Sequence, residues 1–215
     1  MPLLLGHRGH SAQHLENSLE AFRGALSAGM DGFELDVQPT VDAVCVVMHD
    51  DTLERTCHGG GVLRKLKANE LPLLKNGETV PRLSDVLELP AKLINVELKG
   101  EPGWMQALAA VEASDALDRV LFSSFEHSEV LQLWAECHEA RVGFLWDSSE
   151  AADLTRGELE ELPPQLWFHV PLRAVQDRPE LWEPYANRLA VWGMSTFAKA
   201  KSLPFEPAVL IADGL

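Results

Sequence analysis

Short apolar runs alternate with amphipathic stretches along most of the 215-residue chain. Short apolar runs bounded by turn residues predict β-strands, and stretches whose apolar residues recur every three or four positions predict helices. Strands that alternate with helices indicate β/α units around a parallel sheet. The predicted strands are Leu3–Leu5, Gly32–Val37, Cys45–Met48, Leu93–Leu98, Val120–Ser123, Gly143–Trp146, Leu166–Val170, Leu189–Trp192 and Val209–Ala212.

Helices are predicted in most of the gaps between these strands. In the helix predicted over Ser18–Ala28, Leu19 and Phe22 share one face. Asn17 is the expected N-cap of this helix, and Gly29 is the expected stop. The other predicted helices are Ser84–Leu89, Trp104–Ala113, His127–Ala140, Ala151–Leu162, Pro179–Ala186 and Ser195–Leu203.

The strand pattern favours a compact TIM-type (β/α)₈ barrel. Such a barrel needs eight strands, so one of the nine predicted strands is an extra piece. A doubly wound open sheet is the alternative. The first four strands each end in ionisable residues, and a barrel gathers all its strand ends around one mouth, whereas an open sheet gathers only those near its switch point.

Residues 51–90 depart from the alternation of strands and helices. Gly59-Gly60-Gly61, Asn76-Gly77 and scattered prolines indicate loops. We expect a loop-rich excursion after the third strand that lies over the barrel mouth. Residues 1–215 are then a single barrel domain, because the chain is ample for one core and short for two.

Two carboxylates share one face of the second predicted strand. Side chains at i and i+2 of a strand point the same way, so Glu34 and Asp36 lie together. Buried carboxylates repel each other and resist ionisation, and a bound cation removes that cost. No basic residue lies between Asp31 and Asp50 to form a local salt bridge. The pattern therefore favours a metal site.

The strand Leu93–Leu98 repeats this arrangement. Asn95, Glu97 and Lys99 alternate along one face, so Glu97 is the expected third carboxylate ligand. Three carboxylates without a thiol form an oxygen-rich site that suits Mg²⁺ or Ca²⁺. Lys99 is expected beside the metal, as a point charge for a phosphate oxygen.

Two histidines stand at predicted strand ends. His7 and His49 follow different strands, and histidine titrates near neutral pH, which suits general acid–base chemistry. Arg8 follows His7 and can fork onto phosphate oxygens. The remaining histidines fit no motif and are expected in loops or on the surface: His10, His14, His58, His127, His138 and His169.

The charge and the apolar content of the chain limit the classes of partner that we expect it to bind. The chain has 33 acidic and 18 basic residues, a formal charge of −15. Such a surface repels nucleic-acid phosphates and anionic lipid, so we expect no nucleic-acid partner. No apolar run approaches the roughly 18 residues that a membrane span needs, and we expect no stable membrane insertion. The sequence gives no indication of the oligomeric state.

The cysteines and the N-terminal residues indicate the cellular compartment in which we expect the protein. Cys45, Cys57 and Cys137 are odd in number and form no CxxC or zinc pattern, which favours reduced thiols. The first residues lack the basic stretch of a signal peptide. We therefore expect a cytoplasmic protein.

The ordered motifs of the first hundred residues resemble the glycerophosphodiester phosphodiesterase family. No single motif is decisive, but their combination and order are specific. The matching positions are Gly6-His7-Arg8-Gly9, Glu16-Asn17-Ser18, Phe22, Gly29, Glu34-Leu35-Asp36-Val37, Thr40, Asp42, Val46-Val47, His49-Asp50, Leu53, Arg55-Thr56, Gly61 and Val96-Glu97-Leu98-Lys99.

The resemblance implies a TIM-type barrel that hydrolyses small glycerophosphodiesters to glycerol 3-phosphate and an alcohol, a hydrolase reaction of lipid metabolism. It implies one divalent cation, Mg²⁺ or Ca²⁺. It also suggests that Glu16 and Asn17 support the metal ligands or His7. By position, the implied roles are catalysis for His7 and His49, phosphate binding for Arg8 and Lys99, and metal binding for Glu34, Asp36 and Glu97.

The second half of the chain resembles the family only faintly. Ser123-Ser124-Phe125 matches a serine-serine-phenylalanine strand end, and Ile211-Ala212-Asp213 lies where isoleucine, threonine and aspartate are common. Val191-Trp192 lies where members often have tryptophan-threonine-valine-asparagine, but here Gly193-Met194-Ser195 follow. Phe125 and Trp192 are candidates for an alcohol pocket, with core packing as the alternative.

Two other functions stay open at this point. A lysophospholipase D-type enzyme on the same scaffold would act on lipid substrates, and it would need an exposed apolar rim. A non-catalytic protein could bind a phosphodiester without cleaving it. The presence of two histidines beside three carboxylates weighs against the second, because binding alone needs no acid–base pair.

Overall fold

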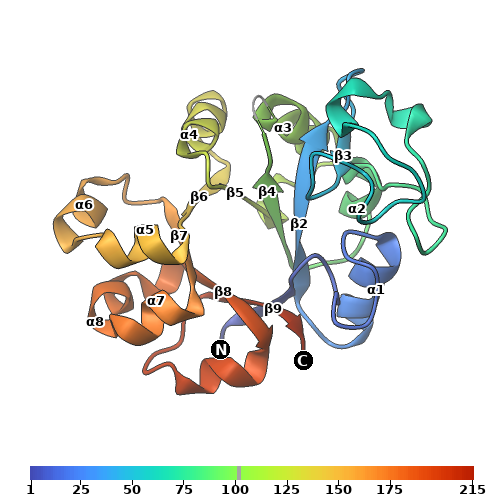
Figure 1. Ribbon diagram of the computed structural model, residues 1–215. Helices are drawn as coiled ribbons and strands as arrows, with labels where there is room; N and C mark the ends of the chain where they lie inside the picture. Colours follow the sequence, from blue (N-terminus) through green and yellow to red (C-terminus); the bar gives the residue numbers. More distant parts are fainter. Residues whose placement is uncertain (101–102) are drawn as a thin grey trace.

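The computed structural model describes residues 1–100 and 103–215. In this part of the chain nine strands form one sheet, and helices surround it (Figure 1). The strands are β1 (Leu3–Gly6), β2 (Gly32–Pro39), β3 (Cys45–Val47), β4 (Leu93–Leu98), β5 (Val120–Ser124), β6 (Arg141–Leu145), β7 (Trp167–Pro171), β8 (Leu189–Thr196) and β9 (Val209–Gly214).

The sheet closes into a parallel barrel. Along the described chain, eight strands follow the neighbour order β1-β9-β8-β7-β6-β5-β4-β2, and β1 also pairs with β2 to close the ring. The closing register places Leu5 opposite Gly32. The predicted (β/α)₈ barrel is confirmed. The extra strand is β3, which runs antiparallel to β2 outside the ring.

The helices of the described chain follow most of the predicted positions. None of them has the length and apolar character needed to cross a membrane. The α-helices are α1 (Leu19–Ser27), α2 (Leu83–Leu87), α3 (Trp104–Ala113), α4 (His127–Glu136), α5 (Ser148–Asp153), α6 (Arg156–Glu161), α7 (Leu172–Asp177) and α8 (Pro179–Trp182), and the 3₁₀ helices are η1 (Leu63–Lys65), η2 (Ala68–Glu70), η3 (Leu117–Arg119), η4 (Glu183–Arg188) and η5 (Phe197–Ser202).

Several predicted helix boundaries are wrong. The helix predicted over Ala151–Leu162 is two helices, because the Thr155 hydroxyl accepts a hydrogen bond from the Glu158 amide and starts α6. The helix α4 ends four residues early, since Cys137 is extended. Ser195 belongs to β8 rather than to a helix.

The prediction that Asn17 caps the first helix is also wrong. The cap is Ser18, whose hydroxyl accepts a hydrogen bond from the Ala21 amide at 3.0 Å. Asn17 lies one residue earlier with φ of 56°, a left-handed conformation that asparagine tolerates. This conformation leaves its side chain available for a contact inside the barrel, described below. Gly29, with φ of 91°, ends the helix region as expected.

Alternation along the strands separates two apolar layers. On β2, Phe33, Leu35 and Val37 are buried in the large cluster beneath the helices. A second cluster, which includes Leu5 and Leu93, fills the inside of the barrel. The carboxylates lie farther toward the carboxyl ends of the strands: on β4, Glu97 follows Leu93 by four positions.

The segment between β3 and β4 has a small core of its own. Leu53, Leu63 and Leu74 are fully or almost fully buried in one cluster with residues of the β3 region. From this segment, Arg64 Nη2 donates a hydrogen bond to the Lys99 carbonyl at 2.7 Å. The segment therefore reaches the carboxyl end of β4.

Candidate active site

A cavity of about 240 Å³ lies at the carboxyl ends of the barrel strands. Its lining brings together most of the residues that the sequence predicts for the site, although they come from β2, β4 and β8 and from the loops that follow β1, β3, β4 and β5. The lining residues are His7, Arg8, Glu34, His49, Asn95, Glu97, Lys99, Phe125, Leu145, His169, Trp192 and Ile211.

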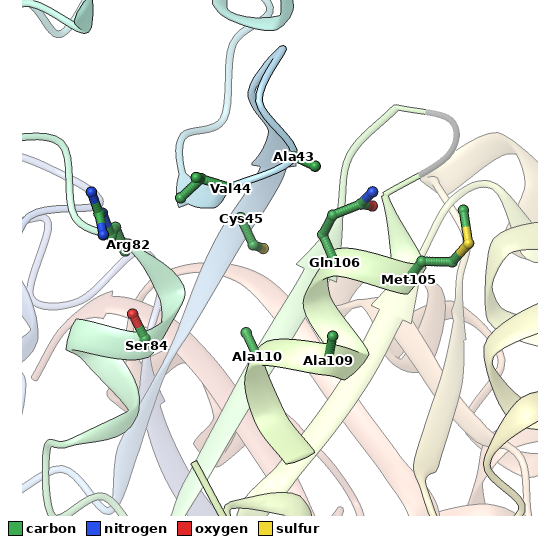
Figure 2. A pocket seen from close by; sticks show the side chains of 9 residues that line it. All are labelled: Ala43, Val44, Cys45, Arg82, Ser84, Met105, Gln106, Ala109 and Ala110. Carbon is green, nitrogen blue, oxygen red and sulfur yellow. The ribbon is translucent and has the colours of Figure 1, made fainter. Parts of the chain in front are cut away.

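A second hollow of about 480 Å³ lies outside the barrel, between α2 and α3 (Figure 2). Neither a histidine nor a carboxylate is among the described residues that line it. Burial raises the pKa of the Cys45 thiol at its base to about 12, so this thiol is not a nucleophile near neutral pH. The barrel cavity, unlike this hollow, is lined by both histidines and carboxylates.

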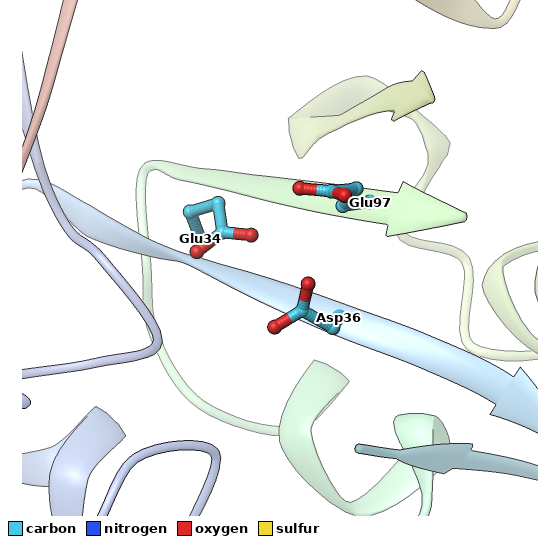
Figure 3. A group of neighbouring side chains, drawn as sticks. All are labelled: Glu34, Asp36 and Glu97. Carbon is cyan, nitrogen blue, oxygen red and sulfur yellow. The ribbon is translucent and has the colours of Figure 1, made fainter. Parts of the chain in front are cut away.

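Three buried carboxylates converge in the barrel (Figure 3). One oxygen each of Glu34, Asp36 and Glu97 lies within 4.8 Å of the others. The parallel register of β2 and β4 places Asp36 directly opposite Glu97, and Glu34 lies on the same face of β2 as Asp36. At most 9% of any of the three residues is exposed.

Burial makes this cluster electrostatically costly. It raises the pKa of Glu34 to about 8 and the pKa of Glu97 to about 7, and the neighbouring Asp36 charge adds to both shifts. Two cations offset part of the repulsion. Lys99 Nζ lies 2.5 Å from Glu97 Oε1 and 3.6 Å from Asp36 Oδ1, and Arg8 Nε lies 3.2 Å from Asp36 Oδ2.

The donor set fits a hard divalent cation. Among the described residues Glu34 Oε1 has no hydrogen-bond partner, although it is buried. A buried carboxylate oxygen without a donor is expected where a cation binds, since desolvation is otherwise uncompensated. Three carboxylates without thiol or imidazole in the cluster suit Mg²⁺ or Ca²⁺.

Each of the two predicted catalytic histidines has its own aspartate. His7 Nδ1 lies 2.8 Å from Asp213 Oδ1, and His49 Nδ1 lies 2.6 Å from Asp50 Oδ1. A carboxylate at Nδ1 favours the tautomer with its proton on that nitrogen, which leaves Nε2 for proton transfer. Burial by itself lowers the pKa of His7, but Asp213 and Glu34 raise it above its ordinary value.

Loop residues hold Arg8 and Asp36 in place. The Arg8 amide donates to Glu34 Oε2 at 2.9 Å, and Arg8 Nη1 donates to Glu16 Oε1 at 2.7 Å. Glu16 therefore contacts the cationic side chain, rather than His7 or the carboxylate cluster. Asn17 Nδ2 donates to Asp36 Oδ2 at 2.9 Å, so it orients one of the three carboxylates.

Aromatic rings form another part of the cavity wall. Phe125 and Trp192 meet edge to face, with ring centroids 6.2 Å apart. The Lys99 ammonium lies 5.7 Å from the Phe125 ring centroid. Phe125 is 40% exposed, so this part of the wall is open to the outside.

Sequence reasoning missed the two aspartates that hold the histidines. Asp50 stood beside His49, and Asp213 stood in a faint strand-end motif, so both carried a signal that was not assigned a role.

The expectation that His169 lies in a loop or on the surface is wrong, because it lies on β7 inside the barrel, fully buried. Burial lowers its pKa to about 3, so it is neutral near pH 7. His10, expected in a loop or on the surface, is also buried.

His169 needs a glycine beside it. A Cβ atom at Gly143 would lie 2.7 Å from the imidazole ring of His169, so no other residue fits there without a shift. Both ring nitrogens lack a hydrogen-bond partner among the described residues. The ring is thus a neutral polar group against the cavity.

Comparison with known proteins places this arrangement in a family. The profile of the Glycerophosphoryl diester phosphodiesterase family matches residues 7–195. The chain belongs to this family. The match covers the whole site except Ile211 and Asp213, and it extends into the half of the chain where the resemblance by motif is faint.

Two curated relatives of this family member carry the name glycerophosphodiester phosphodiesterase. The protein from Caldanaerobacter subterraneus subsp. tengcongensis is 34% identical over 161 residues, which is 67% of this chain and 66% of the relative. The protein from Bacillus altitudinis is 36% identical over 151 residues, 60% of each chain. The chain therefore matches less than two thirds of either relative's length.

A crystal structure supports the assignment over the whole fold. The glycerophosphodiester phosphodiesterase from Thermotoga maritima superposes with a TM-score of 0.78 at 30% identity. The alignment covers 99% of this chain and 95% of that one. The barrel of this family member thus extends over essentially the whole length of the Thermotoga protein.

The raised carboxyl pKa values predict how stability depends on pH without a divalent cation. Glu34 keeps its proton in the folded protein above its ordinary pKa of 4.5, so its stabilising contribution is full below that value and is lost as the pH rises through about 8. The free energy of unfolding should therefore fall over this range, as measured by urea denaturation in chelator.

Glu34→Gln should make this fall smaller, because the amide does not titrate. Some fall should remain, since the pKa of Glu97 is also raised, to about 7. Glu160→Gln on α6 is the matched control, because Glu160 is exposed. An equal fall in wild type and Glu34→Gln would contradict the electrostatic description of the cluster.

Proposed function

We propose that the chain is a metal-dependent phosphodiesterase that hydrolyses glycerophosphodiesters to glycerol 3-phosphate and an alcohol. The observation that carries this proposal is the shared cavity. It is lined by Glu34 and Glu97 of the buried carboxylate cluster and by two histidines that are each paired with an aspartate. A site that only binds a phosphodiester has no need of a proton-transfer pair.

One Mg²⁺ or Ca²⁺ ion would be held by Glu34, Asp36 and Glu97. When bound, this ion supplies positive charge to the phosphoryl oxygens of the substrate. Arg8 and Lys99 would supply further positive charge to the same oxygens. These groups give a local positive field in a protein whose formal charge is −15.

The two histidines would transfer the protons of an in-line displacement at phosphorus. One takes a proton from the nucleophile, which is water or the 2-hydroxyl of the glycerol. The other gives a proton to the oxygen of the leaving alcohol. Asp213 and Asp50 hold the two rings so that Nε2 is the transferring atom. Such general acid–base help contributes ~10²–10⁴-fold.

Phe125 and Trp192 would contact the organic part of the substrate. Their edge-to-face pair lines the cavity together with Leu145 and Ile211, which makes this wall mainly apolar. Because Phe125 is 40% exposed, we expect the leaving alcohol to reach solvent past this ring.

A substrate panel tests the reaction and the metal requirement together. Glycerophosphocholine, glycerophosphoethanolamine and glycerophosphoglycerol should each release glycerol 3-phosphate with Mg²⁺ or Ca²⁺ present, and none should do so in EDTA. Release is measured with glycerol-3-phosphate dehydrogenase. Hydrolysis of lysophosphatidylcholine alone, measured as release of choline, would instead support the lipid-directed alternative. Full activity in chelator would contradict the metal requirement.

Replacement of either histidine tests the acid–base assignment. His7→Ala and His49→Ala should each lower kcat by at least ~10²-fold, because a proton transfer is lost. Divalent-cation binding, measured by calorimetry, should persist, since neither side chain belongs to the carboxylate cluster. His138→Ala, which removes an exposed histidine in the turn after α4, is the control. Near-normal turnover in either variant would refute the mechanism.

A further inference from the structure

The side chain of Arg55 contacts two carboxylates, Asp50 and Glu16, at the edge of the proposed site. It lies in the turn that follows His49-Asp50, and 45% of the side chain is exposed. Arg55 Nε and Nη2 lie 2.5 and 2.9 Å from the two carboxylate oxygens of Asp50. Arg55 Nη1 and Nη2 lie 2.6 and 2.9 Å from the two oxygens of Glu16. A single guanidinium thus forks onto two carboxylates.

Both carboxylates also hold a residue of the proposed machinery. The Asp50 carboxylate bonds to His49 Nδ1 at 2.6 Å, and the Glu16 carboxylate accepts from Arg8 Nη1 at 2.7 Å. The contacts therefore form one continuous series from His49 through Asp50, Arg55 and Glu16 to Arg8. Arg55 stands in the middle of this series.

The two carboxylates that Arg55 contacts, Glu16 and Asp50, stay ionised. Burial by itself raises the pKa of Glu16, but hydrogen bonds from Arg55 and Arg8 lower it to about 2. The hydrogen bonds of Asp50 with Arg55 and His49 hold its pKa well below its usual range. Both therefore remain hydrogen-bond acceptors throughout the pH range in which a histidine can transfer protons.

The position of Arg55 is fixed by its neighbours in the chain. Leu53 and Cys57, two residues to either side, are buried in the small core of the 51–90 segment. Lys75 Nζ donates a hydrogen bond to the Arg55 carbonyl at 2.8 Å. The backbone is thus held on both sides, and the guanidinium is presented from a packed base.

We propose that Arg55 is a positioning residue that fixes His49 relative to Arg8 through Asp50 and Glu16. This inference rests on the proposed function, in which His49 transfers a proton and Arg8 holds the phosphate. It assigns the 51–90 segment a role in catalysis, as the support of this guanidinium. A lysine cannot replace it, because an ammonium is a point charge without a planar fork.

Turnover is measured first. Arg55→Ala should lower kcat on glycerophosphocholine by ~10-fold or more, since a misplacement of about 1 Å costs up to ~10²-fold. Arg55→Lys should recover little of this loss. Added guanidinium should partly restore the Arg55→Ala variant, whereas ammonium should not. Arg173→Ala, which removes the exposed ion pair with Asp177 on α7, should match wild type in kcat.

A spectroscopic measurement gives an answer that does not depend on activity. In ¹⁵N spectra of the imidazole rings, His49 should be mainly the Nδ1–H tautomer in wild type and a mixture in Arg55→Ala. His7 is the internal control, because Asp213 holds it and Arg55 does not touch that aspartate. Its tautomer should be unchanged in the variant.

The outcomes separate this inference from the proposed function. If wild type hydrolyses no substrate, the proposed function fails, and the His49 tautomer alone decides the role of Arg55. If wild type is active and Arg55→Ala has the same kcat and the same His49 spectrum, the positioning role is refuted. A kcat loss that guanidinium does not restore, with an unchanged His49 tautomer, would show a purely structural role and would also refute it.

Discussion

Repulsion among three buried carboxylates is the constraint on which the rest of the site depends. Glu34, Asp36 and Glu97 converge within 4.8 Å, and burial with neighbouring charge raises the pKa of both glutamates. Arg8 and Lys99 offset this repulsion only in part, because Glu34 Oε1 still has no donor among the described residues. A divalent cation is the simplest group that completes the charge balance, and such a cation also attracts a phosphodiester.

The barrel explains how such a cluster can form. Parallel strands place residues of β2 and β4 side by side at the same end, while alternation sends Phe33 and Leu35 into the outer core. The first and last strands also contribute there, since β9 pairs in parallel with β1 and brings Asp213 to His7. The mouth therefore combines a cluster of three carboxylates with two histidine–aspartate pairs, contributed by segments from both ends of the sequence.

The parts of this site that follow from the alternation of side chains along a strand could be predicted from the sequence. Alternation along two strands correctly places Glu34 with Asp36 and brings Glu97 to them. It cannot separate β3 from the barrel strands, because an apolar run is the same whether a strand lies inside or outside the ring. The Asp213 contact spans 206 positions, which no local pattern reports. The predicted N-cap, Asn17, lies one residue before the observed one, Ser18, because asparagine and serine both cap helices well.

A calorimetric titration of Mg²⁺ and of Ca²⁺ into chelator-treated protein tests the central claim most directly. Wild type should bind about one ion of at least one of these cations per chain with a saturable heat, as a three-carboxylate oxygen site implies. Asp36→Asn should lose this binding, since Asp36 is opposite Glu97 and shares a face with Glu34. Asp153→Asn, an exposed residue at the end of α5, should keep it. Absence of saturable binding of both ions to wild type, or unchanged binding in Asp36→Asn, would contradict the account.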